Sequence, residues 1–263
     1  MPHETVLITG ASSGIGRELA KRFAADGSRL ALLARSGGEL QTLAEELRSR
    51  HKTDARIFTV DLARPDSPAQ VLNHLRAAGL KVDVLVNNAG FGAQGRFSDI
   101  SLERQLQMIQ VNMTCLVHLT HLLLPEMMQR NHGGLLNVAS TAAFQPGPFM
   151  AVYYATKSFV LHFSEALAEE LRGTGIAVSA LCPGPTRTRF AEAAQMKNSP
   201  LMKMSSMSAA EVARIGYEGF RRGHLIVIPG VRNRLLAFCV RLAPRSLVRK
   251  VVGRLNVDRG HTR

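Results

Sequence analysis

A tyrosine and a lysine four positions apart, Tyr153 and Lys157, are well suited to proton transfer. On a helix this spacing places both side chains on one face. A tyrosine ordinarily titrates near ~10, so its hydroxyl needs a nearby cation to act at neutral pH, and Lys157 is that cation. Ser140 and Asn112 precede the pair. Each residue alone fits an ordinary structural role, but together they predict a site of acid and base chemistry.

Short apolar runs alternate with longer amphipathic stretches and must form the elements that position these side chains. The expected strands are residues 5–9, 29–34, 55–60, 82–86, 135–139, 176–181 and 225–228. The expected helices are residues 15–25, 39–50, 68–78, 102–129, 152–172 and 209–222. Strand followed by helix, repeated, predicts an α/β fold with a parallel sheet covered on both faces. Ligands of such sheets bind beyond the carboxyl ends of the strands.

A glycine-rich turn, Gly10, Gly14 and Gly16, follows the first expected strand and opens the first expected helix. Glycine takes positive φ and lets backbone amides approach a ligand, while a helix N-terminus offers unpaired N–H groups to a phosphate. Ser12 and Ser13 add hydroxyl donors. The spacing predicts a phosphate-binding turn, although a plain tight turn between strand and helix also fits it.

Residues after the next three expected strands extend this nucleotide site. Arg35 stands where an NAD-binding chain usually has an acid for the ribose 2′-hydroxyl, and a guanidinium suits a 2′-phosphate instead. NADP is therefore favoured, with a surface arginine at a strand end as the alternative. Asp61 and Leu62 are placed to meet the adenine, and the Asn-Asn-Ala-Gly run at 87–90 offers small residues to a cofactor ribose.

These motifs together resemble the short-chain dehydrogenase/reductases of the compact, single-domain type. The resemblance covers about residues 4–230 and rests on TGASSGIG (9–16), NNAG (87–90), Asn112, Ser140, YYATK (153–157) and PGPTRT (183–188). It implies a Rossmann-like, doubly wound sheet of about seven strands. It also implies an NADP-dependent oxidoreductase acting on CH–OH groups, with a homo-oligomer (dimer or tetramer) paired through helices 102–129 and 152–172.

The resemblance further implies a role for each site residue. Tyr153 is expected to give a proton to a substrate carbonyl oxygen, and Ser140 to polarise that carbonyl. Lys157 is expected to bind the nicotinamide ribose and lower the tyrosine pKa, and Asn112 to hold a water linking Lys157 to solvent. The expected cofactor-binding residues are Gly10, Ser12, Ser13, Gly14, Ile15, Gly16, Arg35, Asp61, Leu62, Asn88, Ala89, Gly90, Tyr153, Lys157, Pro183, Gly184, Thr186 and Thr188.

Substrate choice is expected to lie in residues 144–150 and 190–207. The second segment carries Met196, Met202, Met204 and Met207, flexible side chains that would close over a bulky hydrophobic ketone or serve as ordinary helix packing. The leading hypothesis is NADPH-dependent reduction of a ketone or aldehyde, or the reverse oxidation. A 3-oxoacyl thioester reductase is the alternative among enzymes. From another class, a non-catalytic nucleotide-binding or membrane-attached protein is the alternative.

The net charge and the cysteine content indicate the cellular environment of the protein. The formal net charge is +13, and residues 221–263 carry ten arginines and Lys250 against Asp258 alone, a net +10. Cys115, Cys182 and Cys239 lie far apart, which fits a reducing, cytoplasmic compartment and offers no metal spacing. No metal is expected, and His118 and His121 are expected to be plain helix-face residues.

The basic tail has its own apolar periodicity. Leu235, Phe238 and Leu242, and after Pro244 also Leu247, Val251 and Leu255, recur at helical spacing among the arginines. We expect a nucleotide-binding domain at 1–230 and a basic amphipathic extension at 231–263 with two short helices. These helices would lie on an anionic membrane surface or pack on the domain or a second subunit. Few aromatics accompany the charge, so no nucleic-acid partner is expected.

Overall fold

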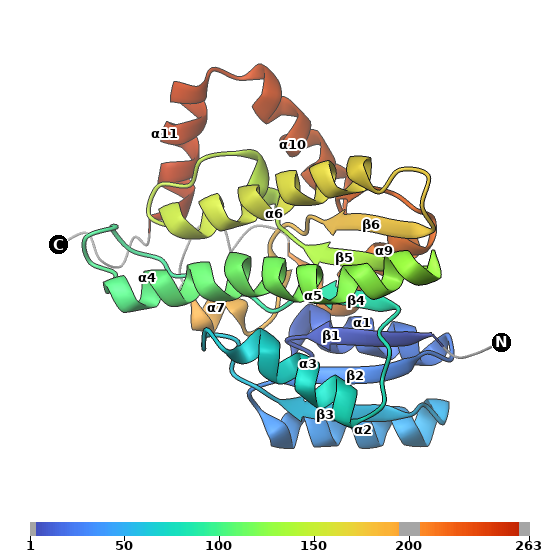
Figure 1. The fold of residues 1–263 in the computed structure, drawn as a ribbon. Helices are drawn as coiled ribbons and strands as arrows, with labels where there is room; N and C mark the ends of the chain where they lie inside the picture. Colours follow the sequence, from blue (N-terminus) through green and yellow to red (C-terminus); the bar gives the residue numbers. More distant parts are fainter. Residues whose placement is uncertain (1–3, 195–205, 258–263) are drawn as a thin grey trace.

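A parallel sheet of seven strands forms the centre of the molecule (Figure 1). The computed structural model describes residues 4–194 and 206–257. The strand order is β3-β2-β1-β4-β5-β6-β9, with every neighbouring pair parallel. The strands are β1 (Thr5–Thr9), β2 (Arg29–Ala34), β3 (Ala55–Thr59), β4 (Val84–Asn87), β5 (Gly133–Val138), β6 (Ile176–Leu181) and β9 (Ile226–Val227). The predicted Rossmann-like α/β fold is thereby confirmed.

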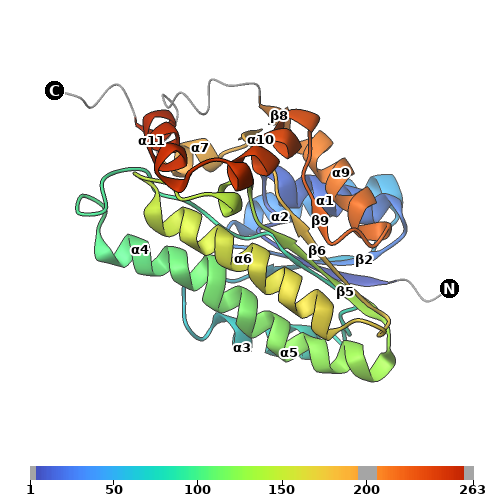
Figure 2. The same ribbon diagram turned by 90° about the horizontal axis from the view of Figure 1, so that it is seen from above.

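Helices cover both faces of this sheet (Figure 2). They are α1 (Gly14–Ala25), α2 (Gly37–His51), α3 (Ser67–Ala77), α4 (Leu102–Ile109), α5 (Cys115–Arg130), α6 (Ala151–Glu170), α7 (Phe190–Ala193), α9 (Ala209–Arg221), α10 (Val231–Leu242) and α11 (Arg245–Asn256). Helices α1, α2 and α9 pack on one face, and α3, α5 and α6 pack on the other.

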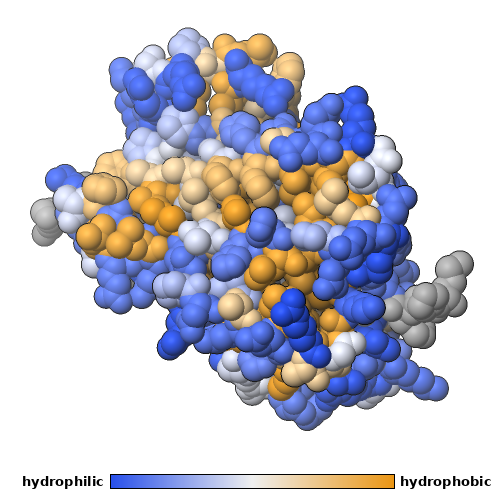
Figure 3. All heavy atoms as spheres, viewed as in Figure 1, coloured by the Kyte–Doolittle hydropathy of each residue, from blue (hydrophilic) through white to orange (hydrophobic). Residues whose placement is uncertain are grey.

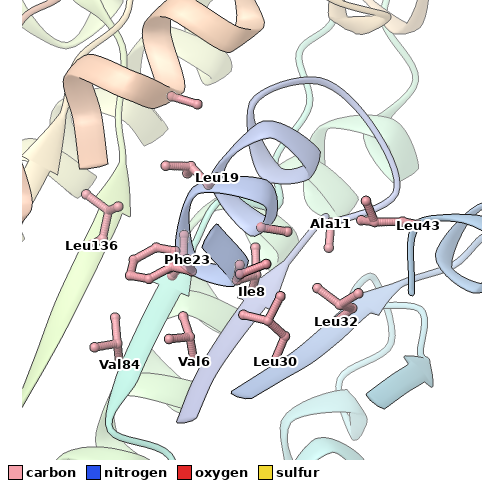
Figure 4. Packing of buried hydrophobic residues seen from close by; sticks show 14 of the residues in the cluster. Val6, Ile8, Ala11, Leu19, Phe23, Leu30, Leu32, Leu43, Val84 and Leu136 are labelled. Atoms are coloured by element: carbon pink, nitrogen blue, oxygen red, sulfur yellow. The ribbon is translucent and has the colours of Figure 1, made fainter. Parts of the chain in front are cut away.

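The core is divided by the alternation of side chains along each strand. On β1, Val6 and Ile8 face α1 while Leu7 faces the opposite helices, and all three are fully buried. Phe23 of α1 lies over this first face, next to Val6 and Val84 (Figure 4). Burying one such side chain stabilises the fold by about 1.5–3 kcal/mol. Burial on both faces explains why the strands are continuous apolar runs in the sequence.

The element boundaries follow the predicted ones closely, with a few differences. β1, β2 and β6 have the predicted bounds, whereas β4 starts two residues later and β5 two residues earlier than expected. The expected helix 102–129 is divided by a π-helical turn, Gln110–Thr114, between α4 and α5. A short parallel pair, β7 (Thr186–Arg187) with β8 (Met207–Ser208), was not predicted. Such π-turns often occur at functional sites.

The C-terminal tail forms the two expected helices on either side of Pro244. Val248 and Val252 of α11 are buried in one cluster with Met150 and Tyr154. The tail therefore packs on the domain along α11, while much of α10 is exposed. By length and composition, one described helical stretch, Leu102–Arg130, could cross a membrane, but it contacts α3, α6 and the sheet as core helices of this fold do.

Candidate active site

A cleft of about 500 Å³ lies beyond the carboxyl ends of the central strands. Its position is set by topology, because β1 has β2 on one side and β4 on the other, and the connecting loops diverge there. The residues that line it come from the glycine turn, from the ends of β2 to β6 and from α6. The cleft thus collects residues that are distant in the sequence.

The glycine turn is fixed to the end of β4 by the side chain of Asn88. Its Nδ2 donates to the carbonyl oxygens of Thr9 (2.8 Å) and Gly10 (3.1 Å). Gly10 has a φ of +65°, which glycine adopts without strain. A Cβ at Gly16 would lie 2.4 Å from Asn88 Nδ2 and from the Gly10 oxygen. Asn88 therefore holds the turn in shape, and Gly16, which was predicted to bind the cofactor but does not line the cleft, leaves the room that this contact needs.

The first turn of α1 is open toward the cleft. Ser13 is the N-cap in extended backbone geometry, and its side chain makes no capping hydrogen bond. Ser12, Ser13, Gly14 and Ile15 all line the cleft. Free amides at a helix N-terminus, beside two hydroxyl groups, suit a pyrophosphate. A dinucleotide fits this part of the structure.

The other residues predicted to bind the nucleotide line the same cleft, along what we call the nucleotide wall. The remaining predicted residues on this wall are Arg35, Asp61, Leu62, Asn88, Ala89, Gly90, Pro183, Gly184, Thr186 and Thr188. Within the described part of the chain, Arg35 forms no ion pair with a carboxylate. Its guanidinium is thus available to an anionic group in the cleft, such as a 2′-phosphate.

Ser140, Tyr153 and Lys157 meet at the inner end of the cleft. Ser140 lies two residues beyond β5, and the other two are on one face of α6. The Ser140 side chain lies near the Tyr153 hydroxyl and lowers the pKa of that phenol. Ser140 Oγ also accepts from the Ala142 amide (3.1 Å) and donates to the Pro183 carbonyl oxygen (3.4 Å). These two bonds fix the Ser140 hydroxyl at the lining of the cleft, next to Tyr153.

Burial determines the protonation of the tyrosine. It raises the pKa of Tyr153 well above the ordinary value, Ser140 lowers that pKa, and Tyr154 raises it. The phenol is therefore neutral at physiological pH, the form that donates a proton. The sequence predicted that Lys157 lowers this pKa. In this structure the groups that shift the pKa of Tyr153 are instead Ser140 and Tyr154, together with burial.

Lys157 is directed to the backbone rather than to the phenol. Its Nζ donates to the Val138 carbonyl oxygen (2.7 Å) and lies 6.0 Å from the Tyr153 ring centroid. Burial lowers the pKa of Lys157 to about 8. The ammonium group is thus partly desolvated and borders the cleft, where an anionic or hydroxyl-bearing ligand would stabilise its charge.

Asn112 lies behind the site, within the π-helical turn. Its side chain is 2% exposed, and its Nδ2 donates to the Phe91 oxygen and to Thr156 Oγ1, both at 3.0 Å. A Cβ at Gly90 would lie 3.1 Å from Asn112 Oδ1 and 3.3 Å from Lys157 Nζ. The structure therefore brings Asn112 close to Lys157 but does not place it on the wall of the cleft.

The substrate side of the cleft is apolar. Phe91, Met150, Tyr154 and Phe190 line it, and Arg104 lies at its edge with its guanidinium 4.1 Å from the Phe91 ring centroid. Met150 and Phe190 belong to predicted substrate segments, whereas Tyr154 and Arg104 were missed. The predicted Met196, Met202 and Met204 lie outside the described residues, and Met207 is in β8.

Asn256 of α11 was also missed, and it joins three segments around this apolar side. It is fully buried; Oδ1 accepts from the Tyr154 hydroxyl (3.2 Å), and Nδ2 donates to the Pro148 oxygen (3.0 Å). Its backbone oxygen accepts from Gln94. Phe149, which follows Pro148 in the chain, has a left-handed φ of +64°. No local sequence signal marks Asn256, because its partners are distant in the chain.

The chain matches the short chain dehydrogenase family over residues 4–199. A solved short-chain dehydrogenase from Sphingobium yanoikuyae, in complex with NADPH, is 35% identical with a TM-score of 0.83, over 93% of this chain and 94% of that one. The protein therefore belongs to the short-chain dehydrogenases, and it is an oxidoreductase acting on CH–OH or carbonyl groups.

Other similar proteins carry names that state different substrates or cofactors. The human very-long-chain 3-oxoacyl-CoA reductase is 29% identical over 96% of this chain and 80% of its own. The bulky-bulky ketone specific alcohol dehydrogenase from Comamonas testosteroni is 31% identical, with a TM-score of 0.78 over 95% and 96% of the two chains. A short-chain dehydrogenase from Burkholderia phymatum, in complex with NAD, is 26% identical with a TM-score of 0.80 over 91% and 92%. The family uses nicotinamide cofactors of both kinds.

Several similar reductases are longer than the matched region. For the macaque, bovine and duck very-long-chain 3-oxoacyl-CoA reductases, the match spans 61% of their length. Among the described residues, no group of three or more His, Cys, Asp or Glu side chains is arranged to hold a metal ion.

Proposed function

We propose that the protein is an NADPH-dependent reductase of ketones or aldehydes with bulky hydrophobic groups, or catalyses the reverse oxidation. The observation that carries the proposal is the position of Ser140 and Tyr153, which border both the nucleotide wall and the apolar wall of one cleft. NADPH, when bound, supplies the hydride that adds to the carbonyl carbon. The residues of the chain supply the proton and the orientation.

The neutral Tyr153 phenol donates its proton to the carbonyl oxygen as the carbonyl group is reduced to an alcohol. Ser140 donates a hydrogen bond to the same oxygen and stabilises the negative charge that develops there. Lys157 binds the nicotinamide ribose at the inner end of the cleft. Asn112 holds a water that connects Lys157 to solvent, so that the phenolate is reprotonated after each turnover.

Replacing Tyr153 with phenylalanine tests this function directly. We expect Tyr153→Phe to lower turnover by roughly 10²-fold or more, because the proton donor is lost, with NADPH affinity unchanged. Turnover and NADPH binding should be measured together, with Tyr217→Phe, a change in α9, as the control. Unchanged turnover in Tyr153→Phe would sink the mechanism and favour a non-catalytic nucleotide-binding protein.

A 3-oxoacyl thioester is the second candidate substrate. Arg104 favours a thioester substrate. This cation lies at the edge of the cleft and forms no ion pair with a carboxylate among the described residues. It would therefore attract a thioester carried by an anionic group. NADPH consumption over ketones of graded size and over acyl thioesters separates the two candidates. If thioesters are the substrates, Arg104→Ala should raise their KM and leave that of neutral ketones unchanged.

The preference for NADP over NAD rests on Arg35. We expect Arg35→Ala to weaken NADPH binding by roughly tenfold and NADH binding little, since only NADPH carries the 2′-phosphate. The control is Arg50→Ala, at the far, exposed end of α2. Titration of both nucleotides measures the effect, and equal losses for the two would contradict this role of Arg35.

We further propose that residues 1–230 form the NADP-binding domain and that 231–263 form an extension. A cytoplasmic homo-oligomer, dimer or tetramer, would pair through α4, α5 and α6. The pairing is supported by a band of hydrophobic side chains over these helices in Figure 3. In α4, Leu102 is 68% exposed and Leu106 is 54% exposed. The cytoplasmic location is supported by three unpaired thiols, Cys115, Cys182 and Cys239.

A further inference from the structure

Helix α10 turns its apolar stripe away from the protein. Val231, Leu235, Phe238 and Leu242 are spaced i, i+4, i+7 and i+11, so they lie along one face of the helix. Their exposed fractions are 76%, 60%, 58% and 74%. An amphipathic helix of a globular domain ordinarily faces such a stripe to the core. Here it has no cover from the described chain.

The inner face of α10 is made of smaller residues. Ala237 is buried, and Val240 packs partly buried against the cluster that contains Tyr154. Asn233 donates to the Pro229 oxygen (2.7 Å). The orientation of α10 is thus fixed from the inside by contacts that leave the larger apolar side chains in solvent.

Basic side chains border the stripe. At 100° per residue, Arg234 and Arg241 fall on one side of it and Arg232 on the other, and all three are exposed. Residues 231–257 contain six arginines, Lys250 and no acidic residue, a net charge of +7. A long basic side chain beside an apolar stripe reaches outward to an anionic group while its stem covers apolar surface.

Helix α11 continues the same surface after Pro244. Leu247 (53% exposed) and Val251 (46%) are one turn apart on its outer side, while Val248 and Val252 are buried on its inner side. Figure 3 shows hydrophobic side chains gathered over α10 and α11 at the top of the view, among hydrophilic ones. The two helices therefore present one mixed apolar and basic surface, which we call the tail face.

We propose that the tail face binds the surface of an anionic phospholipid bilayer, independently of the proposed catalytic function. Apolar side chains in single file, bordered by arginines, suit a helix lying in the plane of the membrane interface. The arginines would meet the lipid phosphates and the stripe would enter the acyl boundary. A second copy of the chain fits less well, because a two-fold contact would bring the same arginines together.

Vesicle sedimentation of the full chain tests the proposal. We expect the protein to pellet with phosphatidylcholine vesicles that contain phosphatidylglycerol, and at least tenfold less with pure phosphatidylcholine, because the anionic headgroups are then missing. The variant Leu235→Ser/Phe238→Ser should bind the anionic vesicles at least tenfold more weakly, since it loses two buried apolar side chains.

The matched control is Phe97→Ser, which removes a comparably exposed apolar side chain (65%) that lies outside the tail face and outside the helices proposed to pair. It should bind vesicles as the unsubstituted protein does. Thermal unfolding of each variant checks that the fold is intact. A polarity-sensitive dye on Cys239, the exposed cysteine of α10, gives a second readout, and its emission should shift to the blue on anionic vesicles only.

Three results would overturn the proposal. The first is absence of binding to anionic vesicles, which would leave the tail face for an acidic protein. The second is full binding by the folded Leu235→Ser/Phe238→Ser variant. The third is a drop in oligomer size, by light scattering, caused by this variant, which would assign the stripe to a second copy of the chain. None of these outcomes depends on whether the enzyme is active.

Discussion

The two walls of the cleft are built in different ways. The nucleotide wall lies where several strands end, and its shape depends on the backbone at Gly10 and Gly16, held by the side chains of Asn88 and Thr9. The substrate wall is assembled from loops and helices far apart in the chain, held together by side chains of Tyr154 and Asn256. The first wall takes its shape mainly from backbone geometry, whereas the second takes its shape from contacts between side chains. Changes to the two walls should therefore separate cofactor binding from substrate binding.

The largest effect is expected on the nucleotide wall, from Gly16→Ala. Its new Cβ would lie 2.4 Å from Asn88 Nδ2 and from the Gly10 oxygen, so the turn has to move. We expect the free energy of unfolding to fall by about 3 kcal/mol and NADPH binding to weaken by roughly tenfold or more.

Gly38→Ala in α2 is the control, because a Cβ at Gly38 meets nothing within 4 Å. Alanine is favoured over glycine in helices, so this variant should unfold at an equal or higher temperature. Thermal unfolding and NADPH titration measure both proteins. If Gly16→Ala bound NADPH normally, the view that backbone shape makes the nucleotide wall would be wrong.

Lys157, between the two walls, should give the protein without cofactor a distinct pH dependence. Burial lowers its pKa from the ordinary 10.5 to about 8, so between these values the folded state binds fewer protons than the unfolded chain. The contribution of Lys157 to the free energy of unfolding therefore rises with pH through this window, by about 3 kcal/mol over its full width. Below pH 8 the cost of burying the charged lysine is present in full.

Lys157→Met removes this titrating group and isolates the effect. We expect the variant to be more stable than the unsubstituted protein at pH 7.5, with the difference shrinking as the pH rises to 9.5. Denaturant unfolding of both proteins at several pH values in this range makes the comparison. Parallel stability curves would show that Lys157 is not desolvated in the free protein.

The smallest effect is expected on the substrate wall, from Asn256→Ala. The change leaves the buried Tyr154 hydroxyl and Pro148 oxygen without this partner, which costs about 2 kcal/mol of folding free energy. The KM for bulky ketones should rise several-fold, while NADPH affinity and kcat for a small ketone stay unchanged. Arg254→Ala, on the exposed side of α11, is the control. Equal losses for small and bulky ketones would mean that Asn256 does not shape the substrate wall.

That the residues of the nucleotide wall line one cleft could be predicted from the sequence, because the signals there are local. Buried strands such as β1 and β2 are continuous apolar runs, and residues directly after them, among them Arg35 and Asp61, necessarily meet at one edge of a parallel sheet. The roles of these residues stay predictions until the cofactor is measured. The π-helical turn around Asn112 escaped prediction, because its residues continue the helical pattern without a break.

The substrate wall and the tail were less predictable for physical reasons. The contact between Tyr154 and Asn256 spans 102 positions, and no short-range pattern encodes it. In α10 the periodicity correctly predicted an amphipathic helix, but not which face is turned inward. The structure buries Ala237 and exposes Leu235 and Phe238, the reverse of what hydrophobicity alone suggests.

The hydrogen bond between Tyr154 and Asn256 joins two residues that are synthesised far apart in time. A chain emerging from the ribosome would present Ser140, Tyr153 and Lys157 while α11 was still unsynthesised. At that stage Val248, Val252 and Asn256 would not yet cover the apolar cluster around Tyr154 and Met150. The nascent protein would therefore expose this apolar cluster to solvent until α11 has left the ribosome and docked onto it.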